Sequence, residues 1–221
     1  MASACVVSSP EDVLPRDRKI IMKKMRVAVF VSGSGSNLQA IIDARIPSIE
    51  IALVFSNNPD AYALKRAENH GIPTLVVNHR DFKSREEFEG EILKHLDPLG
   101  VELIVLAGFM RILSPVLVRA YSNRMINLHP ALLPSFPGIH AARQAIEAGG
   151  KVTGGTVHFV DEGVDSGPII LQAVVPVDDD DDEDSLLQKI HAEEHRIYPE
   201  AIRLISEGKI KIEGKRVLRK T

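Results

Sequence analysis

The sequence predicts an α/β fold: a doubly wound, mostly parallel, Rossmann-like sheet with an antiparallel C-terminal strand pair, a long C-terminal helix and a terminal hairpin. First, near-continuous apolar runs at 26–32, 49–55 and 101–108 alternate with helical segments, as in parallel strands that are buried on both faces. Second, beyond residue 126 the alternation stops and two strands follow each other with a connection too short for a crossover. Third, residues 185–205 repeat their apolar positions with a helical period.

In the N-terminal half, each predicted strand is followed by a predicted helix. Ser84 and Glu87 have the spacing of a capping box, and Ser114 followed by Pro115 is typical of a helix start. A sheet of this kind binds ligands at the carboxyl ends of its strands. The expected strands are 26–32, 49–55, 72–77 and 101–108, and the expected helices are 36–44, 61–70, 84–96 and a short one from Ser114.

In the C-terminal half, strands are expected at 156–160 and 168–177, paired antiparallel across the loop that carries Asp165. The long helix has Ser185 and Gln188 at capping-box spacing, and Pro199 within it predicts a kink or a break. Residues 209–218 alternate around Glu213-Gly214 and predict a hairpin.

Composition limits both the organisation and the class of partner. The 221 residues predict a single domain over 26–221 after a disordered extension, 1–25, in which Met22 or Met25 is an alternative start. Net charge of −3 argues against nucleic acid as the main partner, and no apolar run reaches the length of a membrane span. Cys5 is the one cysteine, which fits a reducing, cytoplasmic location. Nothing indicates the oligomeric state.

The stretch 125–138, MINLHPALLPSFPG, combines a short apolar strand with a proline-rich loop. Strand alternation puts Asn127 and His129 on one face, with Leu128 on the other. An amide, an imidazole and the downstream carboxylate of Asp165 are suited to binding an oxyanion and moving protons. The residues alone leave a second interpretation open, a His-Pro turn with structural hydrogen bonds.

A glycine-rich segment, GSGSN at 33–37, lies between the first strand and its helix. Glycines allow close approach of an anion, and the helix N-terminus offers free N–H donors. Leu38 replaces the third glycine of a dinucleotide motif, and the second strand ends in Ser56-Asn57 rather than an acid, so we expect no NAD. A single phosphate and an empty glycine turn are the two remaining interpretations.

Three segments resemble the folate-dependent formyltransferases: NLHPALLPSFPG from Asn127, GTVHFVDEGVDSGP from Gly155, and SGSGSN near the N-terminus. The resemblance extends from about residue 26 to about residue 208, and the N-terminal segment points to the members that formylate glycinamide ribonucleotide for purine biosynthesis. It implies 10-formyltetrahydrofolate as co-substrate. Direct attack of the glycinamide amine on the formyl carbon needs no covalent enzyme intermediate.

The resemblance also assigns roles to residues. Asn127 and protonated His129 stabilise the oxyanion, while Asp165 pairs with His129 and positions a water that carries the amine proton toward the folate nitrogen. Glu194 binds the ribose hydroxyls, and His191 lies beside it where relatives have other polar residues. The phosphate is held by Gly35, Ser36 and Asn37. The folate is bound by Arg85, Met110, Arg111, Ile112, Leu113, Asn127, Asp161, Glu162, Gly163, Val164 and Asp165.

Several of these residues have a plainer interpretation. Without the resemblance, Met110, Ile112 and Leu113 are interpreted as core residues, and Arg85 is interpreted as a surface arginine that pairs with a helix glutamate. His140 and His158 match family histidines near the site, although His158 lies in an apolar strand and reads as a core histidine.

Two patterns raise the question of a metal. HAEEH at 191–195 fits an inverted zincin motif, and the acidic run 178–184 is rich in carboxylates. The first lacks a third ligand and the second lacks the spacing of a calcium loop, so we expect no metal. The alternative functions are a formyltetrahydrofolate hydrolase, a methionyl-tRNA formylase, an NAD-dependent oxidoreductase and a regulatory nucleotide-binding module.

Overall fold

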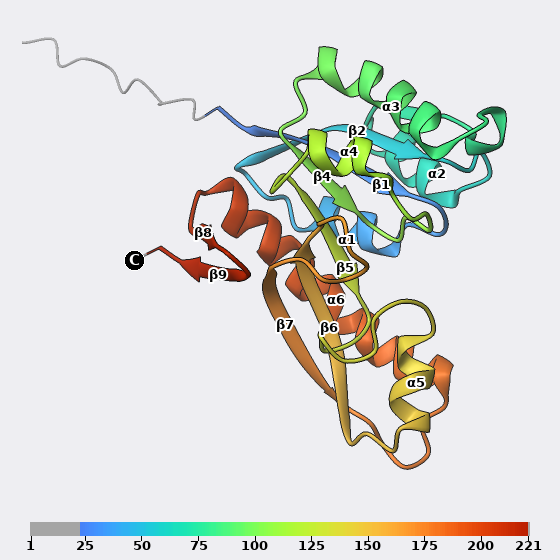
Figure 1. Cartoon of the computed structure of the whole chain (residues 1–221), viewed down its shortest axis with the longest axis vertical. Helices are drawn as coiled ribbons and strands as arrows, with labels where there is room; N and C mark the ends of the chain where they lie inside the picture. The colour runs from blue at the N-terminus through green and yellow to red at the C-terminus, as the bar shows by residue number, and fades with distance from the viewer. Residues whose placement is uncertain (1–22, 221) are drawn as a thin grey trace, which may run out of the picture.

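The computed structural model describes residues 23–220, which form a nine-stranded sheet with the strand order β3-β2-β1-β4-β5-β6-β7-β9-β8 (Figure 1). The strands are β1 Met25–Val31, β2 Ile49–Ser56, β3 Thr74–Val76, β4 Leu103–Leu106, β5 Met125–His129, β6 Val152–Phe159, β7 Ile169–Pro176, β8 Ile210–Glu213 and β9 Arg216–Arg219. The helices are α1 Ser36–Asp43, α2 Tyr62–Asn69, α3 Arg85–Leu99, α4 Pro115–Ala120, α5 Ala141–Glu147 and α6 Glu183–Ser206, with a 3₁₀ turn η1 at His79–Asp81.

Strand directions confirm the predicted fold class. β3, β2, β1, β4 and β5 are parallel, whereas β6 runs antiparallel to β5 and to β7. The terminal hairpin β8–β9 is antiparallel and joins β7 through one parallel pair of residues, Ile169 and Arg216. β1 and β4 are neighbours, but from β1 the chain continues outward to β2 and β3, whereas from β4 it continues outward in the opposite direction to β5. At such a reversal of strand order, the carboxyl ends of the parallel strands open a crevice.

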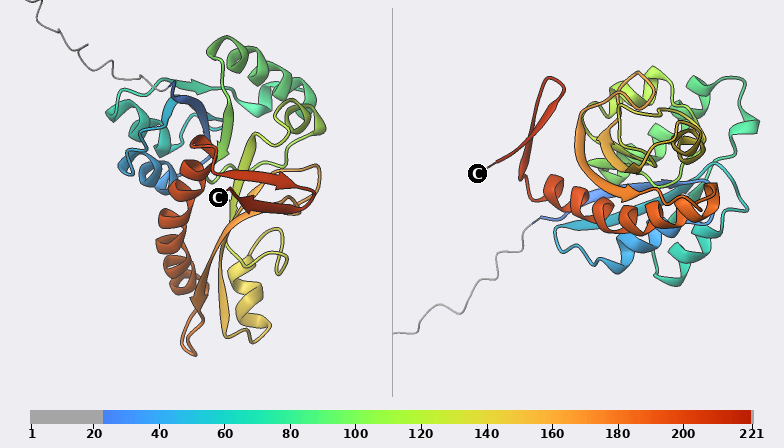
Figure 2. Two further views of the ribbon diagram at one scale, coloured as in Figure 1. Left: turned by 90° about the vertical axis from the view of Figure 1, so that its left-hand side faces the viewer. Right: turned by 90° about the horizontal axis from the view of Figure 1, so that it is seen from below.

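Each central strand sends alternate side chains to opposite faces of the sheet. In β1, Val27 and Val29 pack with α1, α2 and α6, whereas Ala28 and Phe30 pack with α3 and α4. Figure 2 shows α6 running along one face, with the β8–β9 hairpin beyond its C-terminal end. A smaller cluster joins α5 to α6, so the long helix contacts both halves of the sheet.

The predicted N-caps Ser84 of α3 and Ser114 of α4 are confirmed, but the capping box is incomplete, because the Glu87 side chain accepts the N–H of Lys83 rather than that of Ser84. Ser84 accepts a hydrogen bond from the N–H of Glu87, and Ser114 accepts one from Val116 ahead of Pro115. The buried carboxylate of Glu89 also accepts the N–H and hydroxyl of Ser114, at 2.6 and 2.5 Å. This internal carboxylate fixes the start of α4, and with it the end of the loop that follows β4.

The C-terminal half departs from the predictions at three points. The N-cap of α6 is Asp182, which accepts the N–H of Ser185, so the cap lies three residues before the predicted one. Pro199 does not break α6, which continues to Ser206, while the predicted alternative, a kink, stays a prediction. The seven-residue helix α5 was not predicted, because it begins at His140, a left-handed residue without a side-chain cap.

The predicted extension lies almost entirely outside the described residues, which begin at Lys23. The first strand starts at Met25, one residue before the predicted boundary. From residue 23 to residue 220, no helix is both long enough and apolar enough to cross a bilayer.

Candidate active site

The three predicted catalytic side chains meet at the end of β5. Asn127 and His129 extend from the same face of that strand, as strand alternation predicts, and Asp165 comes from the loop between β6 and β7. Asp165 Oδ2 lies 3.3 Å from His129 Nδ1, and Asp165 Oδ1 lies 3.5 Å from Asn127 Nδ2. A carboxylate, an imidazole and an amide therefore converge as expected.

Both nitrogens of the His129 ring face acceptors. Nδ1 faces Asp165, and Nε2 donates to the carbonyl of Phe136 at 2.8 Å. Each contact is best served by an N–H, because a carboxylate oxygen and a carbonyl oxygen can only accept. His129 is buried, which strengthens its interaction with Asp165 relative to the same pair in water.

Asp165 is held in an unusual backbone conformation, with φ of 50° in the left-handed region. Its Oδ2 accepts the N–H of Gly138 at 2.8 Å, and its Oδ1 lies 3.6 Å from Nε2 of the buried His158. Burial by itself would raise the pKa of Asp165, but the His158 ring, the Gly138 N–H and the charge of His129 outweigh it and lower the pKa below 3.8. Asp165 is therefore ionised at neutral pH.

His158 has features of both interpretations given above, a core histidine and a histidine near the site. It is buried, and its Nδ1 donates to the backbone carbonyl of Phe159, as in a core histidine. Its Nε2 also lies 3.4 Å from Asn127 Nδ2. The ring thus lies 3.4 Å from Asn127 Nδ2 and 3.6 Å from Asp165 Oδ1, so it contacts two of the three predicted catalytic side chains.

The glycine-rich segment lines a cavity of about 600 Å³ at the ends of β1 and β2. Gly35 is the N-cap of α1 with φ of 73°, and α1 has no side-chain cap, so the N–H groups of its first turn are not occupied by one. A side chain at Gly35 would place its Cβ 2.6 Å from the Cβ of Ala63, so only glycine fits there. Ser36 and Asn37 follow on the same wall. This geometry suits a phosphate group.

Other residues of this cavity carried no motif in the sequence. Arg80 and His79 bring cationic or polar groups from η1, and Asn57 lies at the end of β2. Arg66 donates to the carbonyl of Ser34 at 2.8 Å and adds positive charge beside the loop. Only their position in the fold identifies these residues, because each one follows the carboxyl end of a parallel strand or lies against that end.

Two further cavities lie on the other side of the β4–α4 loop. One, of about 150 Å³, is lined by Arg111, Ile112, Leu113, Asn127, His158 and residues 160–165, together with Leu106, Phe109 and Val118. The other, of about 630 Å³, extends from Met110 past His129 and Asp165 to Ile139, His140 and Glu183. Their walls combine apolar side chains with loop backbone, as expected of a site for a flat heteroaromatic ligand.

The exposed fractions of the side chains in the loop after β4 test whether Met110, Ile112 and Leu113 are core residues. Met110 is 81% exposed and Ile112 is 68% exposed, so neither is a core residue, while Leu113 packs partly against the core. The loop 161–165 is braced by Asp161, whose Oδ1 accepts the Ser166 hydroxyl at 2.6 Å. Glu162 pairs with Arg119 at 2.7 Å.

Arg85 stands apart from this group. It is the first residue of α3 and lines none of the three cavities, and no ion pair to a helix glutamate is formed within the described residues. Its predicted contact with the folate tail therefore stays a prediction.

The α6 residues lie beside the phosphate cavity. His191 lines it, whereas Glu194 is buried next to Asn37 and does not line it. Burial raises the pKa of Glu194 to about 7, although the Asn37 side chain partly offsets the effect. His191 Nε2 lies 3.9 Å from Glu194 Oε2, and burial lowers the pKa of His195.

Among residues 23–220, no group of three or more histidine, cysteine and acidic side chains is arranged to hold a metal ion. The acidic run is instead used in local contacts. Lys189 binds Asp178 and Asp181 at 2.6 and 2.7 Å, and Asp182 caps α6. The hydrogen bonds to Lys189 and to backbone lower the pKa of Asp181 to about 2.

The three cavities share walls. Met110 and Gly108 line both the phosphate cavity and the larger apolar one, and Asn127 and Asp165 line both apolar cavities. Ser32 ties the two sides together, because its hydroxyl accepts the Met110 N–H at 2.9 Å and donates to Asn57 Oδ1 at 2.7 Å. The cavity beside Gly35 therefore adjoins the cavity lined by Asn127, His129 and Asp165.

Comparison with known proteins places this geometry in a wider context. Residues 25–202 match the family model described as formyl transferase. Phosphoribosylglycinamide formyltransferase of Escherichia coli (strain K12) is 46% identical over 191 residues, which cover 85% of this chain and 90% of that protein. Glycinamide ribonucleotide transformylase 1 from Symbiobacterium toebii superimposes with a TM-score of 0.87 at 49% identity, over 90% of this chain and 95% of that one.

Similarity also extends to a much longer protein. The trifunctional purine biosynthetic protein adenosine-3 of Drosophila melanogaster is 50% identical over 212 residues, which cover 93% of this chain. The chain spans only 16% of the length of that relative.

Proposed function

This chain belongs to the formyl transferase family, and we propose that it transfers the formyl group of 10-formyltetrahydrofolate to the glycinamide amine of 5′-phosphoribosylglycinamide. The products are formylglycinamide ribonucleotide and tetrahydrofolate, in purine biosynthesis. The observation that carries the proposal is that the cavity lined by the glycine-rich segment adjoins, at Gly108 and Met110, the apolar cavity lined by Asn127, His129 and Asp165.

The proposed sites for the two substrates follow from the cavity walls. The N–H groups at the start of α1 receive the phosphate, beside Gly35, Ser36 and Asn37. His191 and Glu194 are assigned to the ribose. The folate is assigned to the loops 110–113 and 161–165, with Arg85 at its glutamate tail, because these loops line cavities with apolar side chains and backbone groups, which suit a pterin.

In the proposed reaction, a bond forms between the glycinamide nitrogen and the formyl carbon, and the bond from that carbon to the folate nitrogen breaks. The Asn127 amide and the imidazolium of His129 stabilise the oxyanion of the tetrahedral intermediate. Asp165, kept ionised by its contacts, stabilises that imidazolium and positions the water that carries the amine proton to the departing nitrogen. Neither a metal nor NAD is part of the proposal.

A hydrolase that uses the same three side chains with water as the acceptor is the alternative. The phosphate cavity favours the transferase, because a hydrolase needs no ribonucleotide site. The deciding experiment measures tetrahydrofolate release with and without glycinamide ribonucleotide. Release that depends on the acceptor, with formylated ribonucleotide as product, supports the proposal, and equal release without the acceptor overturns it.

The same assay separates the remaining classes. A regulatory module would bind the ribonucleotide without transfer, and methionyl-tRNA in its place would be formylated only by a tRNA-directed relative. A cytoplasmic location is part of the proposal, and it is supported by a chain whose one cysteine is Cys5.

A further inference from the structure

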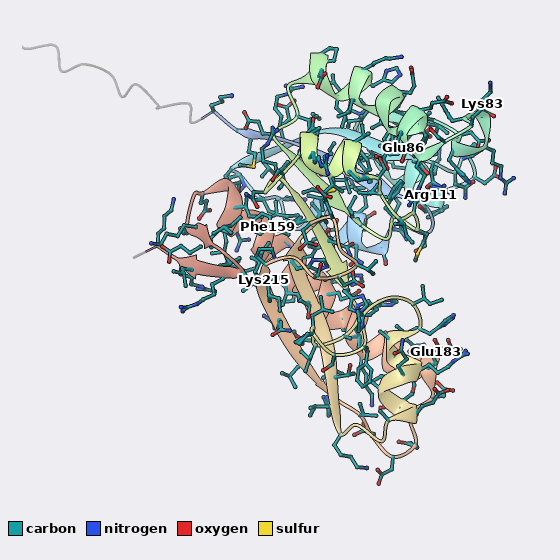
Figure 3. All side chains as sticks on the ribbon, viewed as in Figure 1. Lys83, Glu86, Arg111, Phe159, Glu183 and Lys215 are labelled. Carbon is teal, nitrogen blue, oxygen red and sulfur yellow. The ribbon has the colours of Figure 1, made fainter. Side chains whose placement is uncertain are left out.

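Glu183, the first residue of α6, forms a clasp, defined as its two side-chain contacts to His140 and Arg143, with the segment whose residues 138–142 line the apolar cavity beside His129 and Asp165. Its Oε2 accepts from Arg143 Nε at 2.8 Å and lies 2.6 Å from Arg143 Nη2, while its Oε1 lies 3.2 Å from His140 Nδ1. Figure 3 shows Glu183 beside α5. The carboxylate of Glu183 thus binds two side chains on or next to α5, about 40 residues away in sequence.

The segment held by this clasp also holds the catalytic side chains. Between Phe136 and His140, the Phe136 carbonyl accepts from His129, and the Gly138 N–H donates to Asp165. Phe136, Gly138 and His140 have φ of 52°, 88° and 56°, so three of these five residues are left-handed. Two of the three are not glycine, and such a conformation persists only where surrounding contacts impose it.

We propose that Glu183 is a positioning residue, which through His140 and Arg143 keeps residues 136–140 in the conformation that orients His129 and Asp165. The inference rests on the proposed formyl transfer and adds a residue to its machinery. Glu183 does not touch the reacting groups, so it acts only through the segment it holds.

The anchor itself is firmly placed. Asp182 caps α6 next to Glu183, and Lys189 ties the preceding loop down through Asp178 and Asp181. The Arg143 hydrogen bond and the His140 contact lower the pKa of Glu183, so the clasp is charged at neutral pH.

Loosening the clasp has a distinctive consequence. The Gly138 N–H is one of the contacts that lower the pKa of Asp165, and its loss raises that pKa. Since the reaction needs ionised Asp165, the acidic limb of the pH–rate profile then moves to higher pH. The affinity for the ribonucleotide should not change, because Glu183 does not line the cavity beside Gly35.

The test compares wild type with Glu183→Gln and Glu183→Ala, and with Asp179→Asn as control. Asp179 belongs to the same acidic run, but its one ion pair within residues 23–220 is with the exposed Lys151. We expect kcat to fall about 10-fold in Glu183→Gln, which keeps one acceptor oxygen, and about 100-fold in Glu183→Ala, the range that misplacement of a catalytic group produces. The acidic limb should move to higher pH in both variants, with ribonucleotide Kd unchanged and Asp179→Asn equal to wild type.

Each other result overturns the inference. Wild-type kcat and pH profile in both variants would show that the clasp positions nothing. An equal loss in Asp179→Asn would indicate a general effect of charge or folding, and a rise confined to the KM for the folate would make Glu183 a ligand contact. Absence of transfer in the wild type would overturn the proposed function itself, so the two failures are distinguishable.

Discussion

Glu194 offers a prediction whose size can be worked out from the structure. It is 3% exposed, and burial raises its pKa from 4.5 to about 7 despite the neighbouring Asn37. Between these two pH values the folded protein holds a proton that the unfolded chain has released. The free energy of unfolding therefore falls as pH rises through this window, and at about 1.4 kcal/mol per unit the full loss is about 3 kcal/mol above pH 7.

The perturbation is Glu194→Gln, which keeps the shape and removes the charge. The new amide has an acceptor at hand, because Asn37 Oδ1 is buried without a partner among the described residues. The variant should match wild type in unfolding free energy near pH 4.5, and it should become more stable than wild type by up to about 3 kcal/mol near pH 8. Its affinity for the ribonucleotide should fall at the same time, because a carboxylate acceptor for the ribose is lost.

The assay is urea unfolding at intervals from pH 4.5 to 8.5, with Glu193→Gln as the matched control. Glu193 is the neighbouring residue, but it is partly exposed and pairs with Arg196. Its variant should differ from wild type by no more than about 0.5 kcal/mol at every pH. A stability difference for Glu194→Gln that does not change with pH, or a variant less stable than wild type at pH 8, would refute the reasoning.

Three other variants test the remaining parts of the account. Gly35→Ala should weaken ribonucleotide binding at least 10-fold by calorimetry, because the added Cβ meets Ala63 and the left-handed φ is lost; unchanged Kd would mean that the loop does not hold the phosphate. Asn127→Ala should lower kcat by about 10²–10³ with little change in either KM, as loss of one oxyanion donor does; a purely KM effect would remove Asn127 from the oxyanion. Glu89→Gln should lower unfolding free energy by about 1–3 kcal/mol in urea titrations, because the Ser114 N–H and hydroxyl compete for one remaining oxygen; a neutral effect would show that this carboxylate is dispensable.

The sequence predicted the fold well where hydrophobic pattern decides it. The apolar runs of β1, β2 and β4 are long and buried on both faces, and the caps at Ser84 and Ser114 use standard side chains. Prediction failed where the determinants are not local. α5 follows a left-handed N-cap, His140, which carries no cap signal, and the uniform acidic run did not identify which of its carboxylates would cap α6.

The candidate site shows the same contrast between features that the sequence reveals and features that depend on the folded chain. The convergence of Asn127, His129 and Asp165 could be predicted because their side chains carry recognisable chemistry at recognisable positions, and their catalytic role stays a proposal. The groups that orient them, the Phe136 carbonyl and the Gly138 N–H, belong to the backbone and have no sequence signature. They become visible only when the chain is folded, since every residue has such groups.

The central claim is that Asp165, held ionised against His129, drives the transfer. Asp165→Asn tests it most directly, because asparagine tolerates the left-handed φ of 50° and keeps the size of the side chain while removing its charge. With kcat and ribonucleotide Kd measured separately, the account predicts that kcat falls by about 10² or more while Kd changes less than about twofold. A variant that transfers the formyl group at close to the wild-type rate would contradict it.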